Sequence, residues 1–421
     1  MGANLTFSSA AAIVERLQPG MTVFVPGVSG ESQPFFLALQ RNPGAAGGVT
    51  FVGVHFPGIN TNDYLSLHPT SRQRAYFMSP VVRSGMASGR ADLVPLDYPG
   101  IVRDLETTVS VDVAIAQVSP PDNRGFCSLG ASYDFTPSVW SRSRLRVLHV
   151  NPALPRTNGS FSIHTDDCHL AFEAEADIPG VQAEKPDDAT RAVAANVAGL
   201  VSDGDTLQFG VGRLQTAILE SLAAHRRLNV FSGMVSASVV QLIDSGAIRG
   251  ERAIEAGVAL GDRAFYDRLH ADSTFYFRPV RETHDVRRIA IIQGFCAINS
   301  ALSVDLSGQV NAEWNSGRVI AGAGGLPVFA TGARLAPGGK SIIALMATAD
   351  SGRVSRIIAQ SEVGQLVTLG RHEADYVVTE FGVADLRALS VHGRARALID
   401  IAAPQFRDAL AAKWEDTGRR L

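Results

Sequence analysis

Short runs of β-branched and aliphatic residues recur along the chain, and each is followed by a Gly/Pro turn and then by a helical stretch. The clearest runs are 21–25, 49–54, 111–116, 206–209, 290–292, 328–330, 342–346 and 375–378. Continuous apolar runs of this length are typical of strands buried on both faces, as in a parallel sheet covered by helices. The alternation of strand and helix signals therefore predicts an α/β fold.

The chain is long enough for two globular domains, since its 421 residues exceed the usual size of one. A polar segment with two prolines, 178–188, separates the two halves. We place the boundary after residue 183, which gives an N-terminal α/β domain over 1–183 and a C-terminal one over 184–421. Residues 202–209 resemble 17–24, because in each a helix ends at a Gly-containing turn and a strand follows. This pattern favours two related halves.

Composition and charge exclude several classes of protein. A net charge of −3, with 46% hydrophobic and 19% charged residues, gives no reason to expect nucleic acid or a membrane surface as a partner. The sequence contains neither an apolar run long enough for a membrane span nor a secretory signal pattern. Cys127, Cys168 and Cys296 lie far apart without CxxC spacing, so no disulfide framework or metal site is expected. We expect a cytoplasmic protein.

A first glycine cluster, Phe209–Leu214, directly follows an expected strand and precedes an expected helix over 215–224. Glycines at such a turn let main-chain N–H groups and a helix N-terminus approach a phosphate or a carbonyl oxygen. A tight turn alone also requires glycine. From the residues alone, both interpretations stay open.

A second glycine cluster, Ala321–Leu326, places three glycines in four positions. Its main-chain donors could form an oxyanion hole, or the segment could be a flexible loop. Lys340, one of only three lysines, follows in a Gly-Gly-Lys turn. Its charge would meet either a phosphate or solvent.

In the first half, an ordered-looking loop over 119–130 follows a strand, and Asp122 and Ser128 are expected to fix its conformation. Cys127 in this loop suggests a nucleophile, although a buried small apolar residue is the favoured interpretation. For His55, a packed histidine is favoured over an acid–base group.

Six segments that occur in order together resemble one family. They are 119–130, 210–212, 299–310, 322–325, 338–343 and 378–387, the last continuing to 401–407. The chain resembles the acetyl-CoA hydrolase/transferase family, which includes 4-hydroxybutyrate CoA-transferase. The resemblance implies two related α/β domains of the CoA-transferase type with the active site between them, and a homodimer. It implies no permanently bound cofactor, no metal and no nucleic-acid partner.

Enzymes of this family move CoA, as substrate, from an acyl-CoA to a small free carboxylate. The resemblance implies a glutamate that attacks the thioester and forms an acyl-glutamyl anhydride and then a glutamyl-CoA thioester. Such covalent catalysis divides one difficult exchange into easier steps. Glycine N–H groups stabilise the oxyanions.

Carried over position by position, the resemblance assigns CoA binding to both glycine clusters and to two further residues. The positions are Gly210, Val211, Gly212, Arg213, Leu214, Leu302, Gly324, Gly325 and Lys340. Gly325 would form the oxyanion hole, and Lys340 would lie on the phosphate side. Segments around His55, Asn60 and 76–78 are expected to shape the acyl pocket.

The match breaks at the catalytic glutamate. In the family this residue follows the first glycine turn in a His/Trp-Thr-Glu-Met/Val pattern, but here the aligned position is Gly233, which has no side chain. A second departure is Ser303, where relatives usually carry glutamate. The ligand-binding frame is kept, and the usual nucleophile is absent.

Three explanations compete for this departure. Another carboxylate acts: Glu31 is the first candidate, against the alternative of a helix-start glutamate, and Glu255 and Glu313 follow. Alternatively, the protein uses the oxyanion hole and bound water as an acyl-CoA hydrolase, or passes the acyl group to some other nucleophile. In the third explanation, the protein binds acyl-CoA without turning it over.

One polar cluster, His284–Asp285 with Arg287 and Arg288, is expected on a solvated surface, although arginines near a CoA site could meet phosphate. Glu380, in the strongest family segment, is expected to be structural.

Overall fold

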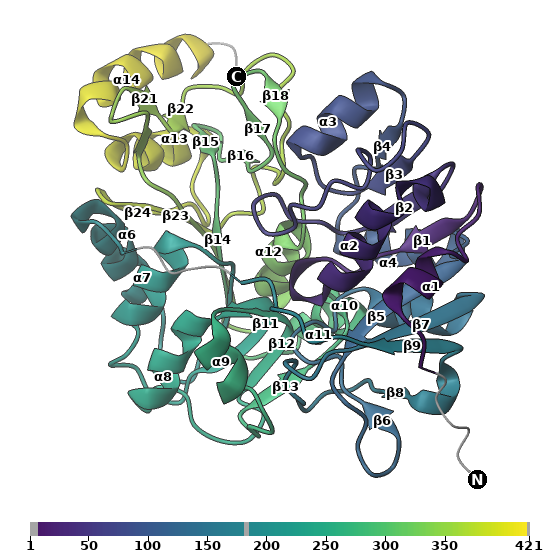
Figure 1. Cartoon of the computed structure of the whole chain (residues 1–421). Coiled ribbons are helices and arrows are strands. Elements are labelled where there is room, and N and C mark those ends of the chain that lie inside the picture. Colours follow the sequence, from purple (N-terminus) through teal and green to yellow (C-terminus); the bar gives the residue numbers. More distant parts are fainter. Residues whose placement is uncertain (1–6, 181–184, 419–421) are drawn as a thin grey trace. The chain divides into compact units, whose positions relative to one another are not determined.

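The structure is a computed structural model that describes residues 7–180 and 185–418 (Figure 1). The chain divides into two compact units. The first comprises Met1–Gln182 and Gly250–Thr283, and the second comprises Ala183–Arg249 and His284–Leu421. The single boundary expected after residue 183 stays a prediction.

The first unit is built on a seven-stranded parallel sheet in the order β4-β3-β2-β1-β5-β7-β9. The strands are β1 (Thr22–Phe24), β2 (Thr50–Gly53), β3 (Arg72–Ala75), β4 (Ala91–Leu93), β5 (Val113–Val118), β7 (Leu145–Val150) and β9 (Leu170–Glu173). All six residues of β5 are buried, as expected for a central strand covered on both faces. Figure 1 shows β1, β5, β7 and β9 side by side in purple to blue.

Helices and short elements complete this unit. The helices are α1 (Ala10–Val14), η1 (Val28–Gly30), α2 (Gln33–Arg41), η2 (Pro43–Ala46), α3 (Pro80–Ala87), α4 (Tyr98–Thr107), α5 (Thr136–Val139), η3 (Trp140–Arg142), η4 (Thr165–Asp167), α9 (Arg263–Arg268) and α10 (Val280–Thr283). Further strands are β6 (Phe126–Cys127), β8 (Ile163–His164), β12 (Ile254–Leu260) and β13 (Phe275–Phe277). Side chains cap several of the longer helices: Ser32 accepts a hydrogen bond at the start of α2, and Asp97 does so for α4.

The second unit carries a sheet in the order β11-β10-β14-β19-β23-β24. Its strands are β10 (Thr206–Phe209), β11 (Asn229–Ser236), β14 (Phe295–Ser300), β19 (Lys340–Ala344), β23 (Tyr376–Thr379) and β24 (Gly382–Asp385). Among the strand pairings described within this sheet, β23 and β24 pair antiparallel and the others are parallel. Its first five strands follow the order of β2-β1-β5-β7-β9 in the first unit, so the relationship between the two halves is confirmed.

The remaining elements of the second unit are helices and short strands. The helices are α6 (Asp188–Ala198), α7 (Arg213–Ser221), η5 (Ala237–Val239), α8 (Val240–Asp244), α11 (Val286–Ile289), α12 (Leu326–Leu335), α13 (Val391–Asp400) and α14 (Pro404–Gly418). The short strands are β15 (Ser303–Asp305), β16 (Val310–Asn311), β17 (Trp314–Asn315), β18 (Arg318–Val319), β20 (Thr348–Ala349), β21 (Val354–Ser355) and β22 (Ile357–Ile358). Within the described ranges, no helix combines the length and the apolar character needed to cross a membrane.

Two of the eight expected strands are wrong. Residues 328–330 belong to α12, which buries them against β14 and β19, and 290–292 lie in the turn that follows α11. A short apolar run does not distinguish a buried helix from a strand, and here Pro327 in the first turn starts a helix. The strand after α11 begins only at Phe295, beyond Gly294, whose φ is +64°.

Candidate active site

The first glycine cluster lies at the carboxyl end of β10, where ligands bind in open α/β sheets. Gly212, with φ of +120°, is the N-cap of α7, a conformation that favours glycine. A Cβ added at Gly210 would meet no atom within 4 Å, so the main chain there faces open space. The exposed Arg213 pairs with Asp187 at 3.5 Å. This turn can offer main-chain N–H groups to a ligand.

Gly233 lies beside this turn because of the strand register. β10 and β11 pair in parallel from Thr206 and Asn229, and continuing that register places Gly233 level with Gly210. The hydroxyl of Ser232 donates a hydrogen bond of 3.0 Å to the carbonyl of the last residue of β10. The position that the resemblance assigns to the nucleophile is thus adjacent to the predicted CoA-binding turn.

The space that a side chain at position 233 would occupy is filled by His284. An ideal Cβ on Gly233 would lie 2.6 Å from Cε1 and 2.8 Å from Nε2 of this imidazole. An ideal Cβ on Gly325 would lie 2.5 Å from the same Nε2. The structure therefore brings Gly233 and Gly325, far apart in the sequence, to one imidazole.

His284 is buried and held by an aromatic contact. Its side chain is 4% exposed, and its ring centroid lies 4.6 Å from that of Phe329 on α12. Burial lowers the pKa of His284 to about 3, so the imidazole is neutral at physiological pH. The expected place of His284 on a solvated surface is therefore wrong. Arg287 and Arg288 are exposed as expected, whereas Asp285 is only 18% exposed, caps α11 and accepts a hydrogen bond from Arg287.

Other predicted ligand residues are distributed around the same sheet edge. Leu302 follows β14, and its main-chain N–H donates to the carbonyl of Asn311 at 2.8 Å. Gln215 of α7 donates to Ser300 at the end of β14 at 2.8 Å, which joins the glycine turn to this edge. Gly324 has a φ of +60°, a conformation that favours glycine, immediately before the N-cap of α12.

Lys340 lies at the opposite, amino end of the sheet. It is the first residue of β19, and its Nζ forms an ion pair of 3.0 Å with Asp205, which precedes β10. Burial alone would lower the pKa of Lys340, but Cys296 and Asp205 raise it above its ordinary value. The structure does not bring Lys340 to the glycine turn. Its phosphate contact stays a prediction.

In the first unit, Glu31 is buried and both of its carboxylate oxygens are hydrogen-bonded. Tyr64 donates to Oε1 at 3.0 Å, and Asn60 donates to Oε2 at 2.8 Å. The Oδ1 atom of Asn60 also accepts from the main chain of Val28, whose φ is +51°. A β-branched residue rarely adopts this conformation, so Asn60 and Glu31 hold a strained loop in place.

A cavity of about 270 Å³ opens beside this cluster, at the carboxyl ends of β2 and β3. Its lining includes His55, Asn60, Gln73, Tyr76 and Phe77. Nε2 of His55 and Oε1 of Gln73 lack hydrogen-bond partners within the described part of the chain. The segments expected to shape an acyl pocket thus lie together around one cavity, which polar and apolar residues line.

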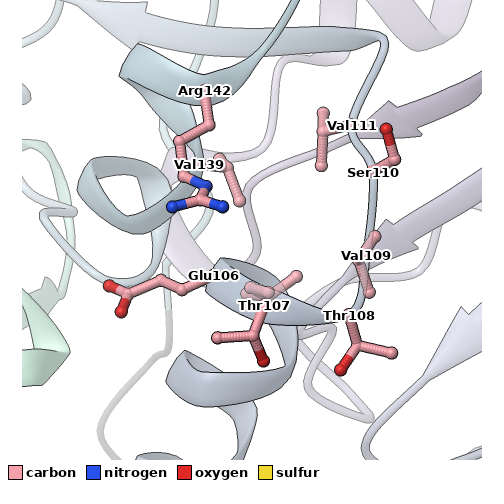
Figure 2. Close-up of a pocket in the computed structure, with 9 residues that line it drawn as sticks. Glu106, Thr107, Thr108, Val109, Ser110, Val111, Val139 and Arg142 are labelled. Atoms are coloured by element: carbon pink, nitrogen blue, oxygen red, sulfur yellow. The ribbon is translucent and has the colours of Figure 1, made fainter.

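A second depression, of about 400 Å³, is bordered by the end of α4, the loop before β5 and Arg142. Figure 2 shows the Arg142 guanidinium and the Glu106 carboxylate extending from the helical segments around it. It lies at the amino end of β5, and none of the candidate residues lines it. The carboxyl-end cavity is therefore the better candidate for substrate.

Comparison with known proteins identifies the family. Residues 6–178 match the model of the acetyl-CoA hydrolase/transferase N-terminal domain, and 261–414 match that of the C-terminal domain. The chain is 34% identical to 4-hydroxybutyrate coenzyme A transferase of Clostridium kluyveri, over 97% of this chain and 96% of the relative. The chain belongs to the acetyl-CoA hydrolase/transferase family. Both CoA transferases and acetyl-CoA hydrolases are among its curated relatives.

Solved structures of similar proteins support the CoA-transferase fold. RipA from Yersinia pestis superposes with a TM-score of 0.91 at 27% identity, covering 98% of this chain and 97% of RipA. 4-Hydroxybutyrate CoA-transferase from Porphyromonas gingivalis gives a TM-score of 0.80 at 28% identity, covering 99% and 98% of the two chains. The two related α/β domains expected from the sequence are those of this family.

The other candidate carboxylates of this acetyl-CoA hydrolase/transferase family member have local partners. Glu255 pairs with Arg278, and Glu313 accepts a hydrogen bond from Thr368 at 2.9 Å. Burial raises the pKa of Glu313. Glu380 accepts from the main chain of Ala347 at 2.8 Å, in keeping with a structural role.

The loop over 119–130 is fixed as expected. Asp122 accepts main-chain hydrogen bonds from Arg124 and Phe126, and the Ser128 hydroxyl accepts from Gly130. Burial raises the pKa of Cys127 to about 12. The thiol is therefore protonated at neutral pH, which favours the buried apolar role over a nucleophile.

Asp134, which sequence analysis did not single out, gives a prediction for pH dependence. Burial raises the pKa of its carboxyl group from 3.8 to about 8. Between these values the unfolded chain releases a proton that the folded chain keeps, so stability falls as pH rises. Asp134→Asn should remove this slope and exceed wild type in stability at pH 8 by a few kcal/mol, at about 1.4 kcal/mol per pKa unit. Melting temperatures at pH 5 and pH 8 test this expectation. Curves for the two proteins that stay parallel would contradict it.

Proposed function

We propose that this protein binds acyl-CoA and moves CoA to a small carboxylic acid without a glutamyl-CoA intermediate at position 233. The observation that carries the proposal is the imidazole of His284, which lies within 2.6 Å of the ideal Cβ of Gly233. Below 3.0 Å, a new Cβ would force the ring to shift. The site therefore combines the family's glycine clusters with an occupied nucleophile position.

Without an enzyme nucleophile, the acceptor acid attacks the thioester directly. One carboxylate oxygen bonds to the thioester carbon, the C–S bond breaks, and CoA leaves as the thiolate with a mixed anhydride remaining. The thiolate then bonds to the acceptor's acyl carbon, and the original acyl group leaves as a free carboxylate. Main-chain donors at Gly325 and at the Gly210 turn support this route, because they can stabilise both oxyanions.

The kinetic order of the reaction tests this route. Both substrates must be bound together. Double-reciprocal plots of initial rate against acyl-CoA concentration, drawn at several acceptor concentrations, should therefore give intersecting lines. A covalent glutamyl-CoA enzyme would give parallel lines and ping-pong kinetics. Parallel lines with a CoA-labelled protein would overturn the proposal and point to a relocated carboxylate.

Glu31→Gln tests whether Glu31, the first candidate carboxylate, acts as a nucleophile or whether the acceptor acid attacks directly. If Glu31 only holds the Val28 loop, the amide should lower stability by about 1–3 kcal/mol, because either Tyr64 or Asn60 loses the carboxylate oxygen to which it donates. We expect CoA transfer to continue at a rate within tenfold of wild type. The check is a chromatographic time course of wild type and variant with and without acceptor, beside their melting curves. Loss of transfer with an unchanged melting temperature would instead make Glu31 the nucleophile.

Acyl-CoA hydrolysis is the second candidate function. It is favoured by the acetyl-CoA hydrolases among the relatives, and water can attack a thioester that is held against the same main-chain donors. Free CoA released without acceptor in the same time course would support it. Acyl-CoA binding without any turnover would support a binding protein. A homodimer in the cytoplasm is part of the proposal and rests on the family resemblance and the composition.

A further inference from the structure

One imidazole nitrogen in the second unit lies between the two glycines on which the proposed reaction depends. Nε2 of His284 is 2.8 Å from the ideal Cβ of Gly233 and 2.5 Å from that of Gly325. The backbone conformation does not require glycine at either position, since Gly325 has φ of −87° and Gly233 has no positive φ. Both positions instead exclude a side chain because the imidazole occupies the space.

The His284 ring is fixed by packing, yet its edge lies beside main-chain atoms of two half-buried glycines. Phe329 packs on His284 at a centroid distance of 4.6 Å, and the side chain is 4% exposed. Gly233 and Gly325 themselves are only half-buried. A ligand can therefore approach the ring edge across two residues that carry no side chain.

The electrostatics define what such a group can do. Burial keeps the imidazole neutral, with a pKa of about 3, which makes it a weak general base near pH 7. A neutral imidazole carries one N–H and one acceptor nitrogen, and the proton is assigned here to Nε2. A fixed neutral donor stabilises charge that develops on a carbonyl oxygen and need not lose its own proton.

We propose that His284 is a catalytic residue whose Nε2–H binds the thioester carbonyl oxygen beside Gly325. This inference rests on the proposed function. As the acceptor oxygen bonds to the thioester carbon, the π electron pair of the carbonyl moves onto the oxygen that His284 holds. The pair returns when the C–S bond breaks and the CoA thiolate leaves. The imidazole keeps its proton throughout.

Two substitutions of His284 distinguish the effect of losing the hydrogen-bond donor from the effect of losing the volume of the ring. His284→Gln can place an amide N–H near the original Nε2, whereas His284→Leu fills space without a donor. We expect His284→Leu to lower kcat by about 10²–10³-fold with KM nearly unchanged, the effect of removing one oxyanion donor. His284→Gln should recover most of that loss. The wild-type kcat should stay flat between pH 5.5 and pH 8.5 in this assay.

A matched control accounts for lost stability. His149 in the first unit is also buried and neutral, with its pKa lowered by burial to about 4, and it stacks on Phe172 at 4.8 Å. His149→Leu should lower the melting temperature as His284→Leu does, with kcat within severalfold of wild type.

Butyryl-CoA binding by calorimetry on each folded variant separates this inference from the proposed function. Wild type that neither binds nor turns over butyryl-CoA or acetyl-CoA would overturn both. Normal turnover by His284→Leu would overturn the role of His284 alone, as would a His284→Gln variant as slow as His284→Leu. An acidic limb in the wild-type pH profile that His284→Gln abolishes would make the imidazole a base and overturn the donor role.

Discussion

Gly233→Glu alone is expected to fail as a restoration of the family nucleophile, while the same substitution combined with His284→Ala should succeed. In the single variant, the new Cβ would lie 2.6 Å from Cε1 of His284, so the ring or the strand must shift. Overpacking of this kind costs about 1–3 kcal/mol. In the double variant, the nearest other atom is Cε2 of Phe329 at 3.6 Å, an ordinary contact.

A double-mutant cycle with alanine measures this effect without any chemistry. Gly233→Ala should destabilise wild type but be nearly neutral in the His284→Ala background, with a coupling free energy of about 1–3 kcal/mol. Gly325→Ala is the matched control. Its Cβ would also lie 2.9 Å from Phe329, so removal of the imidazole should rescue it only in part. Equal costs of Gly233→Ala in both backgrounds would show that the imidazole does not fill this space.

The chemical outcome of the Gly233→Glu variants is read from the mass of the protein. With acyl-CoA present, Gly233→Glu/His284→Ala should gain the mass of CoA as a glutamyl thioester and show ping-pong kinetics, although the adduct should form slowly because the variant lacks the His284 donor. Gly233→Glu alone should gain none. An adduct of equal yield in the single variant would contradict the steric argument.

The sequence predicts much of this molecule because local signals and the global fold agree. Strand 206–209 and the helix after the glycine turn form where the apolar pattern and the glycines place them. The prediction of strands at 290–292 and 328–330 is wrong, because three apolar residues carry no period that distinguishes a helix from a strand. Pro327 was a usable signal for the start of α12.

The site was predictable only where it depends on contiguous motifs. The glycine clusters follow from the chain itself, but the meeting of His284 with Gly233 and Gly325 depends on three separate segments of the second unit. Nothing next to His284 in the sequence marks it as buried, since the charged residues Asp285 and Arg287 follow it, and Arg287 is 88% exposed. Gly233 shows that a glycine can be required by a distant side chain when its own backbone angles do not require one.

Lys340→Met should unfold far more easily than wild type and still bind acyl-CoA with unchanged affinity. The Lys340 ammonium group and the Asp205 carboxylate are 18% and 9% exposed and lie 3.0 Å apart. Asp205 also accepts hydrogen bonds from the main chain of Ser202 and the thiol of Cys296. Removing the lysine leaves a buried charge that these neutral donors only partly stabilise, which costs about 3–5 kcal/mol.

Two further variants distinguish this structural role from the phosphate contact that the resemblance assigns to Lys340. Lys340→Met/Asp205→Asn should recover part of the lost stability, because the uncompensated charge is gone. Arg213→Met changes only an exposed pair and should stay within about 1 kcal/mol of wild type in stability. Because Arg213 lies in the glycine turn, its loss should weaken acyl-CoA binding. Weaker binding by Lys340→Met with little loss of stability would instead place its charge at the CoA phosphates and reverse the structural assignment.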